Sequence, residues 1–475
     1  MRLSEYASLD GTALAELVVA GEVSPAELVG SAQQAALAVD PALHAVVEMY
    51  DDPRIPRAVD TSAAFAGVPF LMKDFGAHER GRHQWMGSRA VDDRLTQSES
   101  VLAQRFRESG LISIGRSATC EFAVTATVES ARFGPTHNPW DLGRTAGGSS
   151  GGAAAAVAAG IVPMAHATDS GGSIRIPAAC CGLVGLKPTR GLIPTDASES
   201  VPVDFHTEFV VTRSVRDAAR ALCSLQKPSG IGPPADARPR RIAVAVEAPW
   251  LSAVDPAVAA ATLHAARLCE QLGHTVEEAT PQVDWPPLFE AMKDIWALGT
   301  LDTVRDWTDI SATRCPAEIE HLTWELVTRA RRLSGTAIID ALAKVDGAAS
   351  SFAGFFDEYD MLLTPTLPTL PPKIGEFSPD MDLNTYYAGA VGRMEPAAAI
   401  FNATGQPAIS IPAGLAGAFP LSVQFAAGAG REPDLLALAA ELEAEIGWAA
   451  WTPPVHAGRP PATNPSTSEY EGHRA

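Results

Sequence analysis

Two glycine-serine clusters in the middle of the chain have the composition of an acyl-transfer site. The first reads GGSSGG over 147–152, and the second reads SGGS over 170–173. A serine flanked by glycines can offer a nucleophile beside free backbone N–H groups that stabilise an oxyanion. An isolated GGSSGG is as often a flexible or phosphate-binding loop. Two such clusters joined by a helix-prone alanine run over 153–159 favour the catalytic interpretation.

A lysine at the end of an apolar segment is the third candidate for chemistry. Residues 67–72 read GVPFLM, the pattern of a buried strand, and Lys73 and Asp74 follow directly. Burying an ammonium group is costly, so the ordinary alternative is a lysine that snorkels to water or pairs with Asp74. In a chain that also carries the two glycine-serine clusters, we favour a catalytic role for Lys73.

The stretch 67–191 resembles the amidase signature family. GGSSGG, then TDSGGSIRIPAACCG, then GLKPTRG follow the signature of that family almost without a break, and GVPFLMKD matches the strand that carries its lysine. The resemblance extends from about Leu9 to Trp451. It implies an α/β amidase-signature fold, in which α-helices cover both faces of a central mixed β-sheet.

The resemblance also implies the site residues. Lys73 is expected to be the catalytic base, Ser149 the bridging serine preceded by a cis peptide bond, and Ser173 the nucleophile. The expected oxyanion hole consists of the backbone N–H groups of Ser170, Gly171, Gly172 and Ser173. The implied mechanism proceeds through an acyl-enzyme and requires no metal and no organic cofactor.

Two regions are expected to select the substrate. The loop with Cys120, Phe122 and Thr125 resembles the loop that precedes the signature, although Cys120 stands where the family often has proline. Residues 286–360 look helical and resemble the section that shapes the substrate pocket. Their tryptophans could contact substrate or simply fill the core, as aromatic residues at helical spacing usually do; they are Trp296, Trp307 and Trp324.

Four polar residues near the signature serines are assigned supporting roles. His166 lies between two alanines in an expected buried strand, so we interpret it as a packed histidine and not as the base. Ser150 could cap the helix that follows it. Asp169 and Arg175 flank the nucleophile and are expected to form an ion pair that holds its loop.

The remaining pattern predicts an α/β protein. Ser24 to Glu27 forms a capping box with proline at the first helical position, which opens a helix to about Val39. Farther on, apolar segments over 241–246 and 274–279 flank a helix that Asp255 would cap. A strand–helix–strand order of this kind indicates a parallel or mixed sheet covered by helices.

The composition limits the partners. The chain has 475 residues, of which 19% are charged, and a formal net charge of −20. This charge argues against nucleic acid or an anionic membrane as a partner. It fits an enzyme with a neutral or cationic substrate, although acidity can equally serve solubility. We expect a small-molecule amide substrate, no nucleic-acid or membrane partner, and a monomer or homodimer.

Compartment and domain organisation follow from the cysteines and the termini. None of the six cysteines has a CxxC or Cys/His zinc spacing, and Cys180-Cys181 looks like a pair of buried thiols. Reduced thiols and the lack of an apolar signal segment predict a cytoplasmic protein. We expect one catalytic domain over residues 1–452, with the signature core at 67–191, and a disordered tail over 453–475.

Three functions are compatible with this sequence. The leading one is a serine hydrolase that cleaves amide bonds of small or medium molecules, with carbamates and esters as related substrates. NPWDLGR, MAHATDSGGSIRIPA and TWELV resemble the bacterial branch that includes 6-aminohexanoate cyclic-dimer, aryl amide and urethane hydrolases. The alternative is the glutamine amidotransferase component that serves aminoacyl-tRNA, where glutamine is usual in place of Ile176. A non-catalytic binding protein is disfavoured because Lys73, Ser149 and Ser173 are all present.

Overall fold

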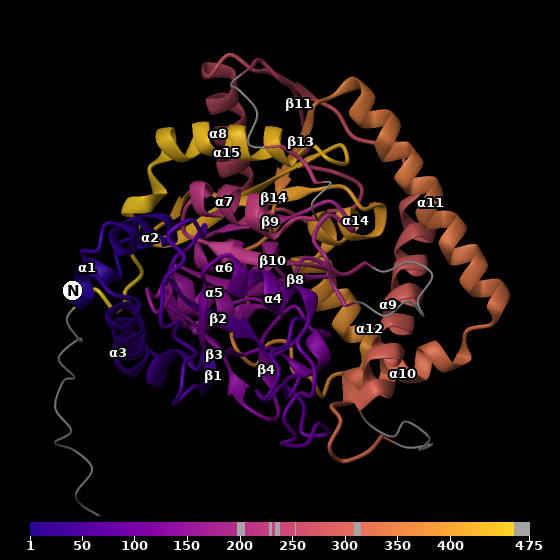
Figure 1. Cartoon of the computed structure of the whole chain (residues 1–475). Helices are drawn as coiled ribbons and strands as arrows, with labels where there is room; N and C mark the ends of the chain where they lie inside the picture. Colours follow the sequence, from indigo (N-terminus) through magenta and orange to yellow (C-terminus); the bar gives the residue numbers. More distant parts are fainter. Residues whose placement is uncertain (197–204, 228–229, 233–237, 252, 308–314, 460–475) are drawn as a thin grey trace, which may run out of the picture.

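The computed structural model describes residues 1–196, 205–227, 230–232, 238–251, 253–307 and 315–459. A mixed sheet of eleven strands runs through this part of the chain (Figure 1). In the order in which they lie side by side, the strands are β1 (Val46–Met49), β3 (Ile112–Ser117), β2 (Pro69–Lys73), β8 (Met164–Asp169), β10 (Thr207–Thr212), β9 (Val184–Lys187), β14 (Ala408–Ala416), β15 (Phe419–Ala427), β13 (Met361–Pro365), β11 (Arg241–Val244) and β12 (Thr275–Glu278).

Helices flank this sheet, which confirms the predicted α/β class. The helices before β10 are α1 (Leu3–Tyr6), α2 (Gly11–Val19), α3 (Pro25–Leu43), α4 (Val101–Glu108), α5 (Gly151–Ala158) and α6 (Arg175–Cys181). Those after β10 are α7 (Val215–Leu225), α8 (Pro256–Gln271), α9 (Trp285–Trp307), α10 (His321–Arg332), α11 (Gly335–Glu358), α12 (Leu383–Tyr386), α13 (Gly392–Met394), α14 (Pro396–Thr404) and α15 (Glu432–Ile446). Short strand pairs β4–β5 (Glu129–Ser130, Gly134–Pro135) and β6–β7 (His137–Asn138, Asp141–Thr145) lie outside the large sheet.

Strand direction decides where the polar residues gather. β2 runs parallel to β3 and to β8, whereas β10 pairs antiparallel with β8. Lys73 is the last residue of β2 and Asp169 the last of β8, so both lie where parallel strands end on the same edge. Antiparallel pairing brings the start of β10 to that edge as well, with Thr207 opposite Asp169.

The predicted helix starts are confirmed. Ser24 Oγ accepts from the Glu27 N–H, and the Glu27 carboxylate accepts from the Ser24 N–H, which is a complete capping box. The helix runs to Leu43, four residues beyond Val39, and ends at His44 in the left-handed conformation.

The alanine run forms the buried helix α5, as predicted. Every residue of α5 is buried, and α5 contacts β8 and α6. A Cβ added at Gly152 would lie 2.3 Å from the backbone nitrogen of Ala118. Small side chains therefore let α5 come close enough to the sheet to present the residues just before it, Ser149 and Ser150, at the sheet edge.

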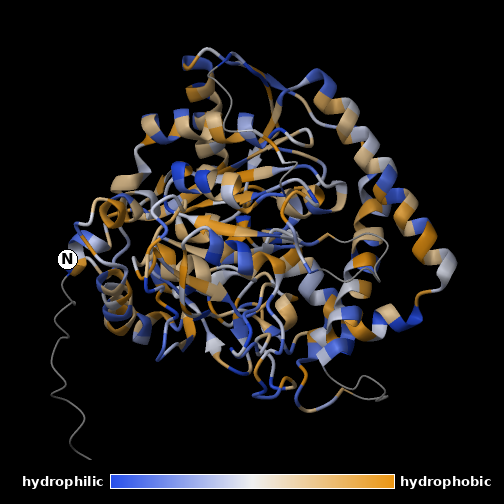
Figure 2. Cartoon of the chain, in the orientation of Figure 1, coloured by the Kyte–Doolittle hydropathy of each residue, from blue (hydrophilic) through white to orange (hydrophobic). Residues whose placement is uncertain are grey.

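The section 286–360 is helical in its described part, as predicted, while residues 308–314 lie outside the described residues. Helices α9, α10 and α11 lie together on one side of the molecule (Figure 1). Hydrophilic and hydrophobic residues alternate along these three helices in Figure 2, which is the pattern of helices with one buried face. Buried residues of α9 and α11 belong to a second apolar cluster that includes Trp285, Phe352 and Phe401, whereas the buried residues of α10 belong to the main core.

The first residues of the tail that was expected to be disordered, 453–459, are instead ordered, which corrects the prediction. Within 453–459, the Val455 N–H donates to Pro139 O at 3.2 Å and the Ala457 N–H donates to Ala159 O at 2.8 Å. Ala457 is buried against the main core. These residues are held because apolar contacts and backbone bonds outweigh their proline-rich composition. Residues 460–475 lie outside the described residues.

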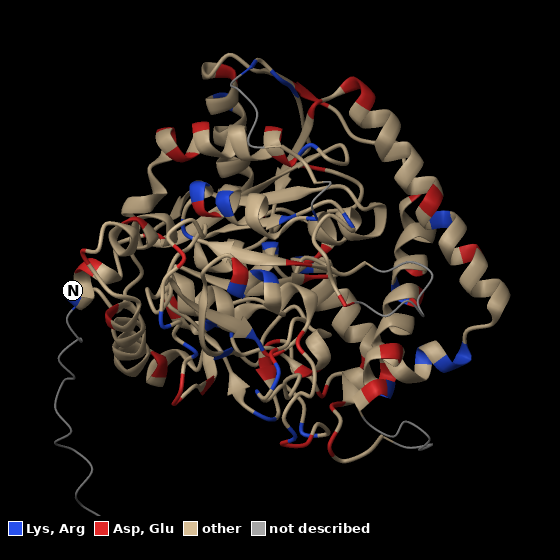
Figure 3. Ribbon diagram, in the orientation of Figure 1, with Lys and Arg blue, Asp and Glu red and all other residues tan. Residues whose placement is uncertain are grey.

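Acidic residues recur along the outer helices α11 and α15 (Figure 3), which fits the net charge of −20. Among the described residues, no helix combines the length and the apolar character needed to cross a bilayer. Cys180 and Cys181 are buried free thiols, as predicted.

Candidate active site

Lys73 lies completely buried among three hydroxyl groups. Its Nζ is 2.7 Å from Ser149 Oγ, 2.8 Å from Thr168 Oγ1 and 3.0 Å from Ser150 Oγ. Its exposed fraction is 0%. No carboxylate in the described part of the chain forms an ion pair with it, so the alternative of a salt bridge to Asp74 is excluded.

Burial lowers the pKa of the Lys73 ammonium to about 7, although Cys120, Glu208 and Asp169 act in the opposite direction. A neutral amine keeps one lone pair and two N–H donors. The three hydroxyl oxygens around it can then include one that donates to nitrogen and two that accept. Near neutral pH, this lysine can therefore serve as a base.

Ser149 is held in one position by its backbone. The peptide bond between Gly148 and Ser149 is cis, as the resemblance implied. The Thr119 hydroxyl donates to Ser149 O at 2.9 Å. A Cβ at Gly148 would lie 2.6 Å from the backbone of Ala126 and Thr127, so only glycine fits there.

Ser150 does not cap helix α5, which corrects the expectation. It occupies the N-cap position, but its side chain makes no capping bond. Its Oγ instead accepts from the Thr168 N–H at 3.2 Å and contacts Lys73 Nζ. The lysine competes successfully for this hydroxyl because a buried amine needs every polar partner within reach.

Asp169 organises the loop that carries Ser173. Its carboxylate accepts from the Gly172 N–H at 2.8 Å and from the Ile174 N–H at 3.2 Å, and it forms two 2.9 Å bonds with the Arg175 guanidinium. Burial would raise the pKa of the Asp169 carboxyl, but Arg175 outweighs it and holds this pKa well below its usual range. The predicted ion pair is confirmed.

The bond to Asp169 changes the expected oxyanion hole. The Gly172 N–H is engaged by that carboxylate, so it is not available to an oxyanion in this conformation. Within the described residues, the backbone N–H groups of Ser170, Gly171 and Ser173 donate to no protein group. Three of the four expected donors are therefore open, and the carboxylate that orders the loop occupies the fourth.

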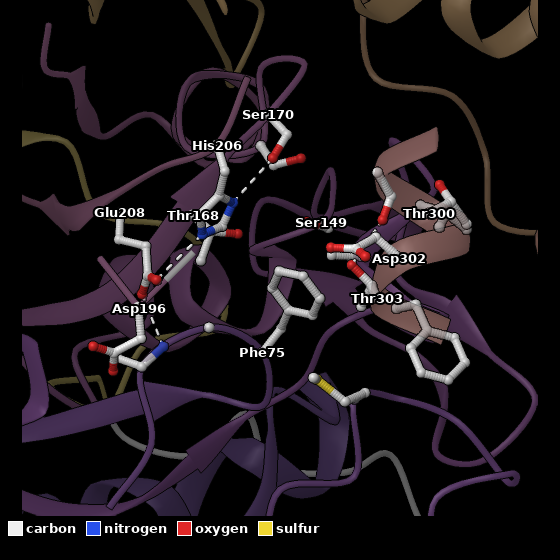
Figure 4. A pocket seen from close by; sticks show the side chains of 18 of the residues that line it. Phe75, Ser149, Thr168, Ser170, Asp196, His206, Glu208, Thr300, Asp302 and Thr303 are labelled. Carbon is white, nitrogen blue, oxygen red and sulfur yellow. Dashed lines mark hydrogen bonds and ion pairs between the residues drawn. The ribbon is translucent and has the colours of Figure 1, made fainter. Parts of the chain in front are cut away.

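A cavity of about 480 Å³ opens beside these groups (Figure 4). Ser149 and Ser173 both line it, and Ser173 is half-buried. Figure 4 shows one wall with Ser170, His206 and Glu208, and an opposite wall with Thr300, Asp302 and Thr303 from α9. The expected nucleophile and bridging serine therefore both face one cavity of small-molecule size.

The loop around residue 120 contributes differently than predicted. Phe122 lines the cavity, together with Ala123 and Val124. Cys120 and Thr125 do not line this cavity; the Thr125 N–H donates to Cys120 Sγ at 3.3 Å and closes the base of the loop. Phe122 and Ala123 adopt positive φ angles of 46° and 58°, which turns the tip of the loop toward the cavity.

The three tryptophans of the section 286–360 also differ in whether they line the cavity. Trp296 and Trp307 on α9 line the cavity, whereas Trp324 on α10 is packed in the main core. The Trp296 ring covers Gly171, where a Cβ would come within 3.0 Å of Cζ3. Helix α9 therefore supplies the apolar surface that was expected of the section 286–360.

His166 is a packed histidine, as interpreted from the sequence. It is fully buried in β8, and burial lowers its pKa. Its Nδ1 accepts from the Lys73 backbone N–H at 3.3 Å, and its Nε2 lies 2.8 Å from Glu208 Oε2. The partner Glu208 and the cavity residue His206 escaped the sequence analysis. Glu208 lies in β10 and His206 directly before it. Their two-residue spacing in the strand-like run HTEFVVT predicts that both side chains lie on one face, and it could have revealed them.

Residues far away in the sequence hold the loop that carries Ser173 through hydrogen bonds to Asp169 and Arg175. Asn402 Nδ2 donates to Asp169 Oδ1 at 2.8 Å, and Gln424 Oε1 accepts from Arg175 Nη1 at 2.7 Å. Within the described residues, no group of three or more His, Cys, Asp or Glu side chains is arranged to hold a metal ion.

The family model for amidases matches residues 27–436, so the chain belongs to the amidase family and is an amidase, an enzyme that hydrolyses carbon–nitrogen bonds. Among sequence relatives, the 6-aminohexanoate-cyclic-dimer hydrolase of a Pseudomonas strain is 34% identical over 490 residues, covering 96% of this chain and 97% of the relative.

Solved structures agree with this assignment. The 6-aminohexanoate cyclic dimer hydrolase in complex with its substrate superposes with a TM-score of 0.85 at 31% identity, covering 94% of this chain and 99% of that one. A glutamyl-tRNA(Gln) amidotransferase component of Thermotoga maritima superposes with a TM-score of 0.76 at 25% identity, covering 92% and 95%.

Proposed function

We propose that this protein is a serine amidase that uses Ser173, Ser149 and Lys73 to cleave amide bonds of small or medium molecules through an acyl-enzyme. The observation that carries the proposal is the 2.7 Å contact between Lys73 Nζ and Ser149 Oγ, beside a cavity that Ser173 also lines. A serine hydroxyl is a weak nucleophile until a base accepts its proton. A lysine with a pKa of about 7 is such a base.

In the first half of the reaction, Ser173 Oγ attacks the amide carbonyl. Its proton passes to Ser149 Oγ while the Ser149 proton passes to Lys73 Nζ. The N–H groups of Ser170, Gly171 and Ser173 stabilise the oxyanion, and each donor contributes about 3 kcal/mol to the transition state. Protons return along the same path to the leaving nitrogen, the C–N bond breaks, and the amine departs.

In the second half, water replaces the amine. The relay takes a proton from water, the water oxygen bonds to the acyl carbon, and the bond to Ser173 Oγ breaks. The carboxylic acid leaves, and Ser173 recovers its proton. The carbonyl chemistry is common to amides, carbamates and activated esters, so we extend the proposed substrate range to all three.

The cavity limits substrate size. A volume of about 480 Å³ falls within the range of small-molecule sites. Its lining combines apolar surface, to which Trp296 and Phe122 contribute, with many polar side chains such as those of His206 and Asp302. The apolar part suits the aryl or alkyl groups of an amide substrate. The cyclic amide named for the similar solved hydrolase has this character. We further propose a single catalytic domain that includes residues 453–459, which pack on the core, and that works in the cytoplasm as a monomer or homodimer.

The competing function is that of a glutamine amidotransferase component. It has one structural argument, the similarity to the Thermotoga protein, but Ile176 stands where that class usually has glutamine. The two functions differ in their need for partner chains. The purified chain alone, assayed on an aryl amide, a carbamate, an aryl ester and glutamine, should hydrolyse the aryl amide and release little ammonia from glutamine. Strict dependence on added partner chains and tRNA would overturn the proposal.

A further inference from the structure

A second set of polar side chains lines the same cavity on the wall opposite α9 (Figure 4). Ser170 Oγ lies 3.0 Å from Nδ1 of His206, and Nε2 of His206 lies 3.2 Å from Glu208 Oε1. These three side chains take no part in the relay through Lys73 proposed above. The hydroxyl, the imidazole and the carboxylate are arranged in the same order as in a serine-histidine-aspartate catalytic triad.

The carboxylate decides which nitrogen of His206 carries the hydrogen. Burial would raise the pKa of the Glu208 carboxyl, but the bonds from His166 and His206 outweigh burial and hold this pKa well below its usual range. An ionised carboxylate only accepts hydrogen bonds. Nε2 of His206 therefore carries the hydrogen toward Glu208, and Nδ1 presents its lone pair to the Ser170 hydroxyl.

Glu208 is held rigidly enough to orient that imidazole. Its Oε2 accepts from the Ala77 N–H at 2.8 Å and lies 2.8 Å from Nε2 of His166. His166 is in turn fixed by the Lys73 backbone N–H. The side chain of Glu208 is 5% exposed, so water competes little for its oxygens. The positions of the imidazole and its carboxylate are thus set by two neighbouring strands.

We propose that Ser170, His206 and Glu208 form a second serine-histidine-carboxylate relay and that Ser170 accepts acyl groups from carboxylic esters with good leaving groups, such as aryl esters. In this step, His206 Nδ1 takes the Ser170 proton as the bond between Oγ and the acyl carbon forms. The bond from that carbon to the aryl oxygen breaks, and His206 returns the proton to the departing aryl oxide.

Hydrolysis of the acyl group returns Ser170 and His206 to their starting states. His206 Nδ1 takes a proton from water, the water oxygen bonds to the acyl carbon, and the bond to Ser170 Oγ breaks with return of the proton to Oγ. An aryl oxide leaves far more readily than an amide nitrogen. The second relay therefore serves aryl esters and does not replace Ser173 in amide hydrolysis.

The test uses the full chain in a Ser173→Ala background with p-nitrophenyl acetate. Ser173→Ala should hydrolyse the ester at least about tenfold faster than Ser173→Ala/Ser170→Ala and than Ser173→Ala/His206→Gln. After brief exposure to the ester, intact mass should rise by one acetyl group, and peptide mapping should place this group on Ser170.

A matched control is Ser98→Ala in the same background. Ser98 Oγ also contacts an imidazole, His78 Nε2 at 3.1 Å, but His78 pairs with no carboxylate in the described part of the chain. Ser98 does not line the cavity. This variant should keep the ester rate of the background within about twofold, because its hydroxyl is not oriented by a carboxylate.

Two results would overturn the second relay: equal ester rates with and without Ser170, including rates no higher than buffer, or an acetyl group mapped to Ser149 or to another residue. Mapping on the single variant needs no second substitution, so it decides even where a double variant folds poorly. The amidase proposal is tested separately, since it depends on amide hydrolysis by the wild-type chain. Either proposal can therefore fail without the other.

Discussion

At the scale of single residues, Lys73 has an environment far from that of an ordinary exposed lysine. It is surrounded by hydroxyl groups of Ser149, Ser150 and Thr168 and by buried backbone. Such a site disfavours the ammonium form and leaves a neutral amine within reach of one serine proton. The direction of the pKa change therefore matches the requirements of a base.

Activity should rise with pH through an apparent pKa near 7. The base works only when neutral, and the pKa of Lys73 is about 7, so activity is present above this value and lost below it. We expect kcat/KM for an aryl amide, measured from pH 5.5 to 9, to follow this curve in the wild type. Lys73→Ala should lose most activity across the range. A larger effect of His166→Gln, with Lys73 dispensable, would show that the wrong base had been assigned.

The Asp169–Arg175 pair should be a large contributor to stability. Asp169→Asn leaves the Arg175 guanidinium buried without a charged partner, which costs about 3–5 kcal/mol. Chemical denaturation should report this loss. Asp92→Asn, in an exposed pair with Arg94, is the matched control and should change the stability far less, because surface ion pairs contribute little. Equal small losses would mean that the nucleophile loop is held mainly by Asn402 and the backbone.

At the scale of secondary-structure elements, the site is assembled from strand ends and the loops that follow them. β2 supplies Lys73, the turn before α5 supplies Ser149, and the loop after β8 supplies Ser173. The roles of Lys73, Ser149 and Ser173 were implied by the resemblance to the amidase signature family. Their positions at a strand end and in two loops were predictable from local sequence, because glycine and serine in unbroken runs specify loops beside apolar strands and helices. The capping box at Ser24 was predictable for the same reason.

Other parts depended on contacts between distant segments and could not be predicted. Asn402 reaches Asp169 across 233 residues, and β10 lies beside β8 although helix α6 and strand β9 come between them in the chain. The engagement of the Gly172 N–H by Asp169 depends on backbone geometry and not on residue type. The same holds for Phe122, which faces the cavity while Cys120 and Thr125 do not.

Helix α9 should control which amides are accepted. Trp296→Ala and Trp307→Ala each remove apolar cavity surface without touching the relay, and one methylene of pocket contact is worth about 1–3 kcal/mol. The ratio of kcat/KM between an aryl amide and a short alkyl amide should change by more than about tenfold. Trp324→Phe, on α10 outside the cavity, should leave this ratio unchanged. Equal losses for both substrates would show that α9 only supports the fold.

At the scale of the whole molecule, the large sheet connects the part of the chain that carries the site with the part that carries the cavity helix. Its β2–β8–β10 portion carries polar groups of the site, and helix α9 lines the cavity. Helices α10 and α11 pack against α9 on the same side of the molecule (Figure 1). The matched family model and the solved hydrolase both extend over most of the chain. The α/β class and the helical pocket section were therefore predictable from overall pattern, whereas the packing of residues 453–459 onto the core was not.

The most direct test of the account is the rate of aryl amide hydrolysis by Ser173→Ala, compared with wild type and with Ser98→Ala. Removal of the Ser173 hydroxyl takes away the attacking atom and no core packing, because this side chain is half-buried at the cavity wall. We predict a fall in kcat/KM of at least about a thousandfold with an unchanged melting temperature, and a rate within about twofold of wild type for Ser98→Ala. A Ser173→Ala protein that hydrolyses the aryl amide at the wild-type rate would contradict the central claim.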